Sequence, residues 1–520
     1  MQIKQTTTNE TINIALDTIE RNKQSLFFVN SKASAEKTAE SIALFIKKQK
    51  IAVHPAAKEL SQTILKAIST PTKQCKRLAS CIEYGVAFHH AGLVQKQKTA
   101  IEDAFRNNII RTISCTPTLA MGVDLPAYRA VIRDLKRFSK NWGQSYIPVL
   151  EYHQMAGRAG RPGKDIRGEA ITIAKTEAEK DNIHEQYIEG EVEDIYSKLA
   201  VEPVLRTYLL SLIATEFVTS KKHIMGFFGK TFWAFQYRDM KKLDSIITKM
   251  LKKLVEWEFL TTDQDDFSSA ADFGNEKYKA TRLGSRVAEL YLDPLTAHDL
   301  IQGMYKTKSR IISPFNLLHL ISSQLELRPL LRLKKAEYED VEETLMKHTS
   351  DLLVTEPSAF DPDYDYFLRS VKTAMFFSRW IEEIGEDVLL KEFNVRPGEL
   401  HAKKERANWI LYAASELAKI LTLHDIEKEF NKLKFRVEYG VKEELFSLLK
   451  LKGIGRIRAR KLFGNKVRNL GDLKKIDVSA LAKLVGKKIA IDLKKQVGIN
   501  IDKIEIKPNK RKGQISLGDY

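Results

Sequence analysis

The 520-residue chain contains little cysteine and no long apolar run. Its only cysteines are Cys75, Cys81 and Cys115. They are too few and too unevenly spaced for a disulfide framework or a four-thiolate metal site, so we expect buried thiols, a reducing compartment and no bound metal. The sequence has neither a signal-like N-terminal segment nor 18 consecutive apolar residues. These absences predict a soluble, cytoplasmic protein without a membrane-spanning segment.

The sequence also lacks the phosphate-binding motif of P-loop ATPases, G-x-x-x-x-G-K-[ST]. The most similar segment is IMGFFGKT, in which Gly226 and Gly229 are three residues apart and Ile224 replaces the first glycine of the motif. Its aromatic residues indicate the core of a winged helix, so we reject it as a nucleotide site. No D-E-x-[DH] box for Mg²⁺ precedes residue 25. The chain alone is therefore not expected to hydrolyse ATP.

Charge, by contrast, is plentiful and predominantly positive. The chain has 85 Lys and Arg residues against 67 Asp and Glu residues, which gives a net charge of +18. Residues 441–520 hold 21 Lys and Arg against 8 Asp and Glu, so this segment contributes +13 of the total. Such a surplus favours a polyanionic partner, nucleic acid before membrane. A role in general solubility is the alternative.

Short apolar runs alternate with helical patterns in the first third of the chain. The runs cover residues 25–30, 86–91, 112–115, 129–134 and 170–174. Strands that are buried on both faces have this appearance, so the pattern predicts a parallel α/β sheet. After about residue 185 the strand patterns nearly vanish and helical spacing dominates.

The later segments predict further domains. Residues 242–262 have helical spacing and lead to the β-prone stretch KYKATRLG, which is typical of a winged helix. The predicted parts are an α/β lobe at 1–184, a winged helix at 185–296, a helical domain at 297–435, a helix-hairpin-helix domain at 436–504 and a flexible tail at 505–520.

Two arginines mark a candidate anion site. Arg158 and Arg161 lie among small residues in EYHQMAGRAGRPG (151–163). A guanidinium group donates hydrogen bonds in pairs and stays charged, which suits phosphate oxygens. The loop TPTLAMGVDLPA (116–127) offers hydroxyl groups and the carboxylate of Asp124 after a neighbouring strand. We expect both loops to form a polar rim at one edge of the sheet, since ligands of parallel sheets lie at the carboxyl ends of the strands. A tight surface turn is the alternative.

Four segments resemble motifs of superfamily 2 helicases. QMAGRAGR (154–161) is similar to motif VI and TPTLAMGVDLP (116–126) to motif V. SLFFVNSKASAEKTA (25–39) is similar to motif IV, and FHHAGL (88–93) to the segment that follows it. The order of winged helix, helical ratchet domain and helix-hairpin-helix resembles the archaeal HelQ-like DNA helicases in particular. The similarity covers nearly the whole chain from residue 20 onward.

The resemblance implies a nucleotide between two RecA-like lobes. Arg158 and Arg161 would reach across the cleft to the γ-phosphate, where charge develops during hydrolysis. Gln154 would belong to the network that couples hydrolysis to movement. Gly122 and Asp124 would connect the nucleotide cleft to the bound nucleic acid.

The resemblance also implies ATP as the nucleotide, with Mg²⁺ held by the first RecA-like lobe. Since only the second lobe is recognised, we expect either a partner chain that supplies the first lobe or a fragment of a longer protein. The implied function is that of a 3′→5′ DNA helicase acting on single-stranded and forked DNA in replication-fork repair. A related RNA helicase, which the helix-hairpin-helix argues against, and a non-catalytic DNA-binding protein derived from a helicase are the alternatives.

A segment between the two loops carries aromatic residues. VIRDLKRFSKNWGQSYIPVLEY (131–152) predicts a β-hairpin with Gly143 at its turn. The family has its strand-separating pin at this place, so Phe138 and Trp142 would stack against the last base pair. An ordinary surface hairpin is the alternative. By the same resemblance, Thr118 would touch the backbone of the bound strand.

A predicted helix from residue 399 places Arg406 and Trp409 three residues apart, and therefore on one face. A cation beside an aromatic ring can contact phosphate while the ring stacks on a base, which suits Arg406 and Trp409. The resemblance identifies this helix as the ratchet helix, with Trp409 as the stacking residue. The family tends to have a further basic residue about two turns earlier, where this chain has Ala402. A buried core tryptophan is the alternative.

The basic tail domain opens on LKGIGRIRARKLF (451–463). Gly453 and Gly455 permit a tight hairpin whose N–H groups, at the start of the next helix, meet a phosphate, and Arg456 and Arg458 add positive charge. This helix-hairpin-helix signature is typical of DNA backbone binding without sequence readout. A purely structural turn is the alternative.

The last residues resemble the peptide by which partners bind a sliding clamp. Gln514, Leu517 and Tyr520 have the spacing of a shortened form of that peptide. Such a tail would be disordered until it docks. A chance match is the alternative, since short motifs recur by accident.

Overall fold

The computed structural model describes residues 3–68, 71–139, 143–163, 165–199, 201–263, 277–309 and 312–499. The chain divides into two compact units, unit 1 with residues 1–196 and 386–402, and unit 2 with residues 197–385 and 403–520. Within the described ranges, no helix is both long and apolar enough to cross a membrane. Trp142 and the predicted clamp-binding residues Gln514, Leu517 and Tyr520 lie outside these ranges. The residue limits of the domains remain predictions.

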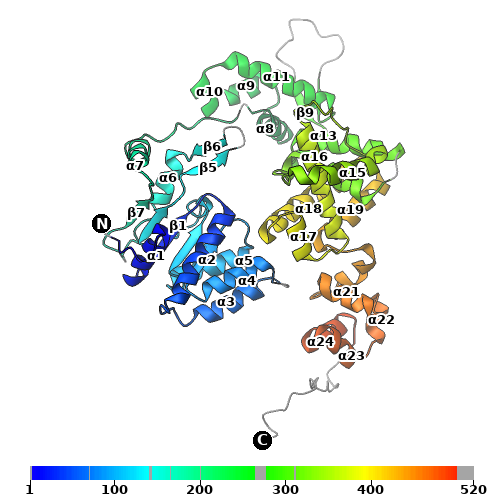
Figure 1. The fold of residues 1–520 in the computed structure, drawn as a ribbon. Helices are drawn as coiled ribbons and strands as arrows, with labels where there is room; N and C mark the ends of the chain where they lie inside the picture. Colours follow the sequence, from blue (N-terminus) through cyan, green and yellow to red (C-terminus); the bar gives the residue numbers. More distant parts are fainter. Residues whose placement is uncertain are drawn as a thin grey trace. The chain divides into compact units, whose positions relative to one another are not determined.

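Unit 1 is built on a five-stranded parallel sheet with the strand order β2–β3–β1–β4–β7. Figure 1 labels β1 and β7 of this sheet. The strands are β1 (Ser25–Phe28), β2 (Val86–His89), β3 (Thr112–Cys115), β4 (Arg129–Ile132) and β7 (Glu169–Thr172). Ser25 lies opposite both Thr112 and Arg129, the first residues of β3 and β4, so the amino ends of these strands share one edge. The predicted parallel α/β fold is confirmed.

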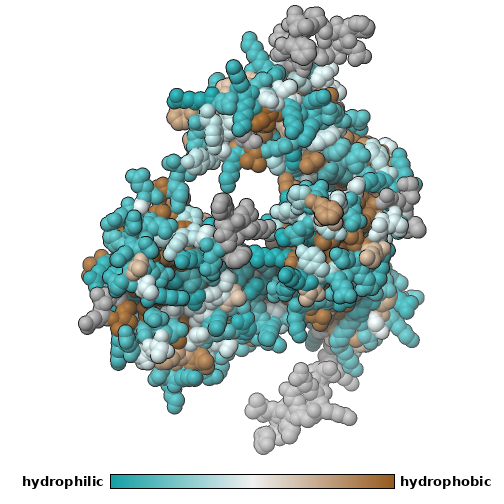
Figure 2. All heavy atoms as spheres, turned by 45° about the horizontal axis from the view of Figure 1, so that its top comes forward, coloured by the Kyte–Doolittle hydropathy of each residue, from teal (hydrophilic) through white to brown (hydrophobic). Residues whose placement is uncertain are grey.

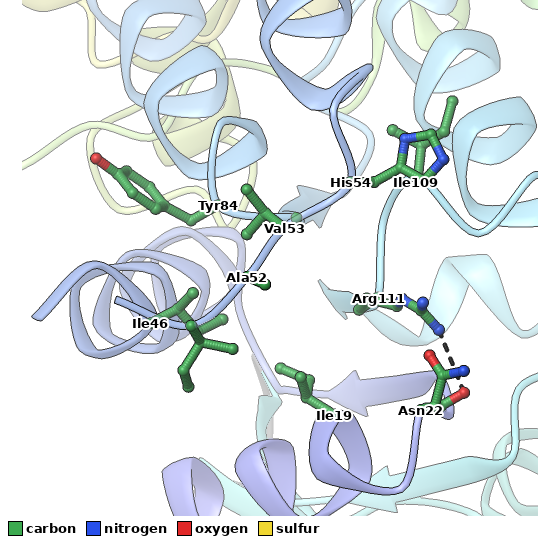
Figure 3. A pocket seen from close by; sticks show the side chains of 11 residues that line it. Ile19, Asn22, Ile46, Ala52, Val53, His54, Tyr84, Ile109 and Arg111 are labelled. Carbon is green, nitrogen blue, oxygen red and sulfur yellow. Dashed lines mark hydrogen bonds between the residues drawn. The ribbon is translucent and has the colours of Figure 1, made fainter. Parts of the chain in front are cut away.

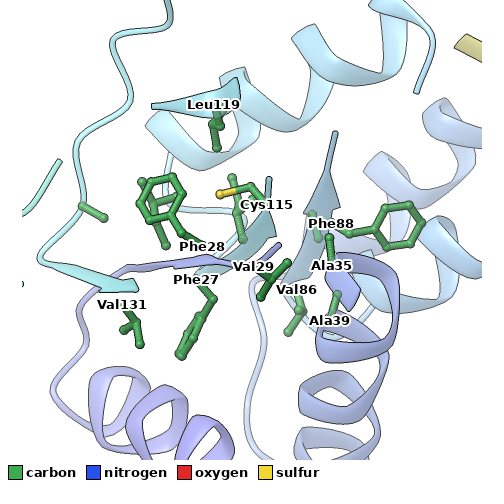
Figure 4. Close-up of a cluster of buried hydrophobic side chains, with 14 of the residues drawn as sticks. Phe27, Phe28, Val29, Ala35, Ala39, Val86, Phe88, Cys115, Leu119 and Val131 are labelled. Atoms are coloured by element: carbon green, nitrogen blue, oxygen red, sulfur yellow. The ribbon is translucent and has the colours of Figure 1, made fainter. Parts of the chain in front are cut away.

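Helices connect these strands and cover the sheet. They are α1 (Glu10–Glu20), α2 (Lys32–Lys48), α3 (Ala57–Lys66), α4 (Lys73–Ile82), α5 (Gln95–Arg106), the 3₁₀ turn Pro117–Leu119, α6 (Val149–Ala156), α7 (Glu177–Ile183) and the π-helical turn His184–Ile188. The register partners Phe27 and Val131 point to one side of the sheet and Phe28 to the other (Figure 4). Both faces are therefore covered, which explains why β1, β2, β3 and β4 are buried along their whole length.

The three cysteines lie buried as free thiols. Burial raises the pKa of Cys81 to about 12 and that of Cys115 well above its usual value. Both thiols therefore stay protonated and pack as small apolar side chains.

A β-hairpin follows β4 in unit 1. Its strands are β5 (Lys136–Ser139) and β6 (Gly143–Tyr146), which pair antiparallel with Lys136 opposite Tyr146. Phe138 lies in β5 with its backbone opposite Gln144. The role of this hairpin as a strand-separating pin remains a prediction.

Unit 2 begins with helices and one small sheet. Its first elements are α8 (Glu202–Ala214), α9 (Lys221–Phe228), α10 (Phe232–Tyr237), α11 (Met240–Glu256), β8 (Leu260–Thr262), β9 (Tyr278–Ala280) and α12 (Arg282–Glu289). β8 and β9 pair antiparallel with Leu260 opposite Ala280, as in the wing of a winged helix. The segment that superficially matched a P-loop is helical here, since α9 buries Ile224 and Phe228.

The rest of the chain is helical. The α-helices are α13 (Pro294–Lys306), α14 (Pro314–Ser322), α15 (Tyr338–His348), α16 (Tyr364–Ile381), α17 (Glu386–Glu392), α18 (Pro397–Ile420), α19 (His424–Tyr439), α20 (Phe446–Leu449), α21 (Arg456–Gly464), α22 (Leu470–Lys475), α23 (Val478–Val485) and α24 (Lys487–Gln496). Short 3₁₀ turns cover Thr307–Ser309, Leu325–Leu327, Lys335–Glu337, Thr349–Asp351 and Glu443–Leu445. The last helices enclose a core of their own that includes Leu445, Leu462 and Leu493.

The mean hydropathy of the chain is −0.30. Figure 2 shows that hydrophilic residues cover most of the face in view, where the hydrophobic residues form small, separate patches. Scattered apolar side chains of this kind are normal on a folded protein and do not by themselves mark a binding surface.

Candidate nucleotide and DNA sites

The loops that resemble motifs V and VI lie against each other in unit 1. The backbone N–H of Gly160 donates to the carbonyl of Ala127 at 2.7 Å, and the N–H of Ala127 donates to the carbonyl of Arg158 at 2.9 Å. Gly160 has a φ of +93°, and a Cβ there would lie 3.3 Å from the backbone of Gly168. A side chain at this position would strain the loop, so glycine allows this close approach.

Arg161 is held in place by a polar network. Its Nε and Nη2 donate to the two carboxylate oxygens of Asp165 at 2.7 and 3.0 Å, and its Nη1 donates to Oε1 of Gln24 at 2.8 Å. Among the described residues, these bonds engage three of the five N–H groups of the guanidinium. The other two N–H groups can donate to an anion while the bonds to Asp165 and Gln24 stay in place.

Asp165 is the centre of this network. Nζ of Lys23 donates to its carboxylate at 2.6 Å, and the Asp165 side chain is only 1% exposed. The hydrogen bond from Arg161, together with that from Lys23 and the charges of both, outweighs burial and lowers the pKa of Asp165 to about 2. The carboxylate therefore stays ionised and fixes the orientation of the Arg161 guanidinium at neutral pH.

The network lies at the amino edge of the sheet, so the prediction of a rim at the carboxyl ends was wrong for Arg161. Gln24 immediately precedes β1, and Asp165 lies before β7. α6 carries the chain from the carboxyl end of β4 back along the sheet. The loop that follows α6 must therefore lie where β7 begins.

The motif V loop spans both edges of the sheet. It leaves the carboxyl end of β3 with Thr116 and Thr118, whose hydroxyl groups are 2.9 Å apart, and it ends at the start of β4. Thr118 thus lies near the carboxyl edge, while Ala127 bonds to the motif VI loop near the opposite edge. The loop physically links the two edges, which suits a connection between a DNA contact and a nucleotide contact.

Arg158 supports the middle of this loop. Its Nε donates to the carbonyl of Ala120 at 3.1 Å, and its Nη1 lies 3.8 Å from the Asp124 carboxylate. The Asp124 side chain is 95% exposed, and the space beside Gly122, whose φ is +79°, is open.

Oε1 of Gln154 is buried, and no donor among the described residues reaches it. Because a buried acceptor normally has a partner, this atom is available to an incoming donor.

A pocket of about 320 Å³ opens at the same amino edge (Figure 3). Its polar side includes Asn22, His54 and Arg111, and Nη1 of Arg111 donates to the backbone carbonyl of Asn22 at 3.2 Å. Burial, and then the charge of nearby Arg161, lower the pKa of Arg111. No residue predicted from the sequence lines this pocket.

The predicted ratchet residues lie on α18. Arg406 is exposed, and it donates to the carbonyl of Arg328. Trp409 is half-buried, with Nε1 donating to the carbonyl of Leu290 at 3.1 Å. Trp409 is therefore not fully buried, and its stacking on a base remains a prediction.

The predicted hairpin of the tail domain is present, but its arginines differ in environment. Gly453 has a φ of +84°, and Gly455 precedes α21 with open space around it. Arg458 is exposed and donates to the carbonyl of Gly453 at 2.9 Å. Arg456 instead stacks on Trp380, with 4.8 Å between its guanidinium carbon and the ring centroid, and donates to a backbone carbonyl of the helical domain. The DNA role of Arg456 remains a prediction.

Sequence reasoning missed Lys23, Gln24 and Asp165. The Arg161–Asp165 spacing of four residues was a usable signal, whereas nothing in the sequence singled out Gln24. It also missed Gly486, which has a φ of +92° and precedes the lysine-rich helix α24. The similarity between GKKIA and the earlier GRIRA could have indicated this second hairpin.

Among the described residues, no group of three or more His, Cys, Asp or Glu side chains could hold a metal ion.

Three known families match consecutive parts of the chain. Residues 58–163 match the helicase conserved C-terminal domain, residues 168–261 a helix-turn-helix domain, and residues 315–440 domain 4 of archaeal helicases. These matches agree with an α/β lobe followed by mainly helical domains.

Relatives that match nearly the full length of this chain agree with these family matches. The chain is 38% identical to the ATP-dependent DNA helicase Hel308 of Methanocella arvoryzae over 95% of its own length and 65% of that protein. It is 36% identical to the Hel308 proteins of Methanococcus vannielii and Pyrococcus horikoshii, over 94% and 96% of its own length and 68% and 67% of theirs. The chain thus spans about two thirds of the length of the relatives it matches.

Proposed function

Because the chain belongs to the Hel308 family of superfamily 2 DNA helicases, we propose that it forms the second RecA-like lobe and the DNA-gripping domains of an ATP-dependent 3′→5′ DNA helicase. It acts on single-stranded and forked DNA in replication-fork repair. Arg161 supports this function most directly. A buried carboxylate fixes its guanidinium while two N–H groups remain for a phosphate.

Hydrolysis in this proposal takes place between two lobes. The 520 residues contain neither a P-loop nor a D-E-x-[DH] box, so a first RecA-like lobe, on a separate polypeptide or in a longer form of the chain, supplies both and holds Mg²⁺. Arg158 and Arg161 complete the nucleotide site from this side. Gly122 and Asp124, in the loop that spans the sheet, pass the state of the nucleotide to the DNA contact at Thr118.

A reconstitution experiment tests this function. This chain, mixed with a separately produced first lobe that carries the P-loop, should hydrolyse ATP in the presence of single-stranded DNA and unwind a forked DNA, whereas neither component should do so alone. Phosphate release and strand separation measure the two activities. A reconstituted pair that hydrolyses no ATP with DNA contradicts the motor function. Preferential unwinding of RNA forks would instead support the RNA helicase alternative.

Trp409 should affect unwinding more than hydrolysis. Loss of one base stack costs about 1–3 kcal/mol, so Trp409→Ala should lower the unwinding rate of the reconstituted motor about tenfold while ATPase turnover changes by less than about threefold. Trp409→Phe is the matched control, because it keeps a stacking ring but loses the Nε1 bond to Leu290. Equal losses of both activities in Trp409→Ala would indicate that the residue only supports the fold.

A further inference from the structure

Two segments that are far apart in the sequence meet in unit 1. The backbone N–H of Gly398, in the RPGEL segment that begins α18, donates to the carbonyl of Gly92 in FHHAGL at 3.0 Å. A Cβ on Gly398 would lie 2.5 Å from the carbonyl oxygen of Leu93, and one on Gly92 would overlap the Arg396 side chain. Glycine at both positions therefore permits the backbones to touch.

A buried carboxylate joins the same segments. Oε1 of Glu36, on α2, accepts a hydrogen bond from Nε of Arg396 at 3.0 Å, and Oε2 accepts one from Nη1 of Arg77 at 2.5 Å. The Glu36 side chain is only 6% exposed. A carboxylate this buried needs such cationic partners, so removal of Arg396 leaves part of its charge uncompensated.

His90 of the FHHAGL segment completes the arrangement. Its Nδ1 accepts the N–H of Gly92 at 3.1 Å, so the ring proton lies on Nε2, which faces Oε1 of Glu36 at 3.2 Å. Burial alone would raise the pKa of Glu36, but the contacts with His90 and Arg396 and the charges of Arg396 and Arg77 lower it to about 2. Glu36 thus remains ionised throughout the physiological pH range.

A second ion pair reinforces the contact at its exposed margin. Nζ of Lys32, in the first turn of α2, pairs with Glu399, whose other carboxylate oxygen accepts the backbone N–H of Arg396 at 2.8 Å. Both side chains of this pair are about 30% exposed. We call Lys32, Glu36, His90, Arg396 and Glu399, with the Gly92–Gly398 contact, the Glu36 latch.

We propose that the Glu36 latch couples movement of the second RecA-like lobe to the ratchet helix. The latch holds the first turn of α18, a 24-residue helix that continues through Arg406 and Trp409. At 1.5 Å per residue, Trp409 lies about 18 Å along the helix from Pro397. A helix fixed at its first turn transmits displacement of that turn to the residues farther along it. Glu36 and Arg396 are therefore positioning residues for Trp409, an inference that rests on the proposed helicase function.

Hydrogen exchange on this chain alone tests whether the latch exists in solution. Arg396→Gln removes one of the two arginines that bond to Glu36. It should increase the exchange rate of the Gly398 amide about tenfold, because hydrogen bonds to charged groups are among the strongest that side chains make. Exchange within β1 and β3 should not change. An unaltered Gly398 exchange rate would overturn the latch, whether or not the protein acts as a motor.

The coupling test combines Arg396→Gln with a charge swap at the exposed margin, and the swap leaves the partners of the buried Glu36 carboxylate in place. In the reconstituted motor, Arg396→Gln, Lys32→Glu and Glu399→Lys should each raise the number of ATP molecules hydrolysed per base pair unwound at least about threefold. The ATPase rate should stay within about twofold. The double variant Lys32→Glu/Glu399→Lys should recover much of the coupling of its parent singles. Lys48→Glu, the same charge change at an exposed position of α2, should behave like the unmodified chain.

The two proposals fail differently. An unmodified motor that neither hydrolyses ATP nor unwinds DNA contradicts the proposed function, while the exchange experiment still decides whether the latch forms. An active motor in which Arg396→Gln accelerates Gly398 exchange but leaves the ATP cost per base pair unchanged overturns the coupling role.

Discussion

Replacing Arg161 by alanine should lower the DNA-stimulated ATPase turnover of the complete two-lobe motor by about 10³-fold or more. Arginines that reach a transferring phosphoryl group from another lobe or protein contribute about 10³–10⁵ in turnover, because they neutralise charge that develops in the transition state. Arg161 has the geometry for this role, since Asp165 and Gln24 fix the guanidinium but use only part of its donor capacity. Steady-state phosphate release at saturating DNA measures the effect.

Stability must be separated from catalysis in this experiment. Arg161→Ala also leaves Asp165 with Lys23 as its remaining cationic partner, so the variant should unfold at a lower temperature. Arg161→Lys is the matched control, because it restores a cation beside Asp165 but lacks the planar fork. This control should regain most of the thermal stability while its ATPase remains low. Undiminished turnover in Arg161→Ala would remove the assigned role.

The DNA affinity of this chain should fall by about 10³-fold or more between 50 and 200 mM monovalent salt. Binding that neutralises six or more phosphates releases condensed counterions, and this release gives a steep dependence on salt. The net charge of +18, with +13 in residues 441–520, provides enough Lys and Arg side chains to neutralise this number of phosphates. Fluorescence anisotropy with a labelled DNA fork, measured across a salt series, gives the slope. An affinity that does not respond to salt would contradict a backbone-dominated interface.

Two arginines of the tail domain provide an internal comparison. Arg458 is exposed, so Arg458→Ala should weaken binding and reduce the salt slope by about one. Arg456 stacks on Trp380, so Arg456→Ala should change the slope less. A larger slope change for Arg456→Ala would indicate that this side chain leaves Trp380 when DNA binds.

The parts of this protein that the sequence predicts well are those with local signals. Short runs of four to six residues that are rich in apolar side chains predict strands of a parallel sheet covered on both faces, and these strands are found as β1, β2, β3, β4 and β7. Arg158, Arg161 and the tail glycines were recognisable because guanidinium groups and unusual backbone conformations are properties of single residues or short motifs. The absence of a P-loop motif from the 520 residues is likewise evident from the sequence alone.

Family membership, the parallel α/β lobe and the chemistry available at motif VI can thus be inferred from the amino acids alone. Three contacts become apparent only in the folded chain: Arg161 bonds to Gln24 at the amino edge, Arg456 stacks on Trp380, and Arg396 bonds to Glu36. The physical reason is sequence separation. Hydrophobic periodicity reports which face of one element is buried, but no local pattern specifies which distant charge will compensate a buried carboxylate. Such pairs exist only once the chain has folded and brought both partners out of water together.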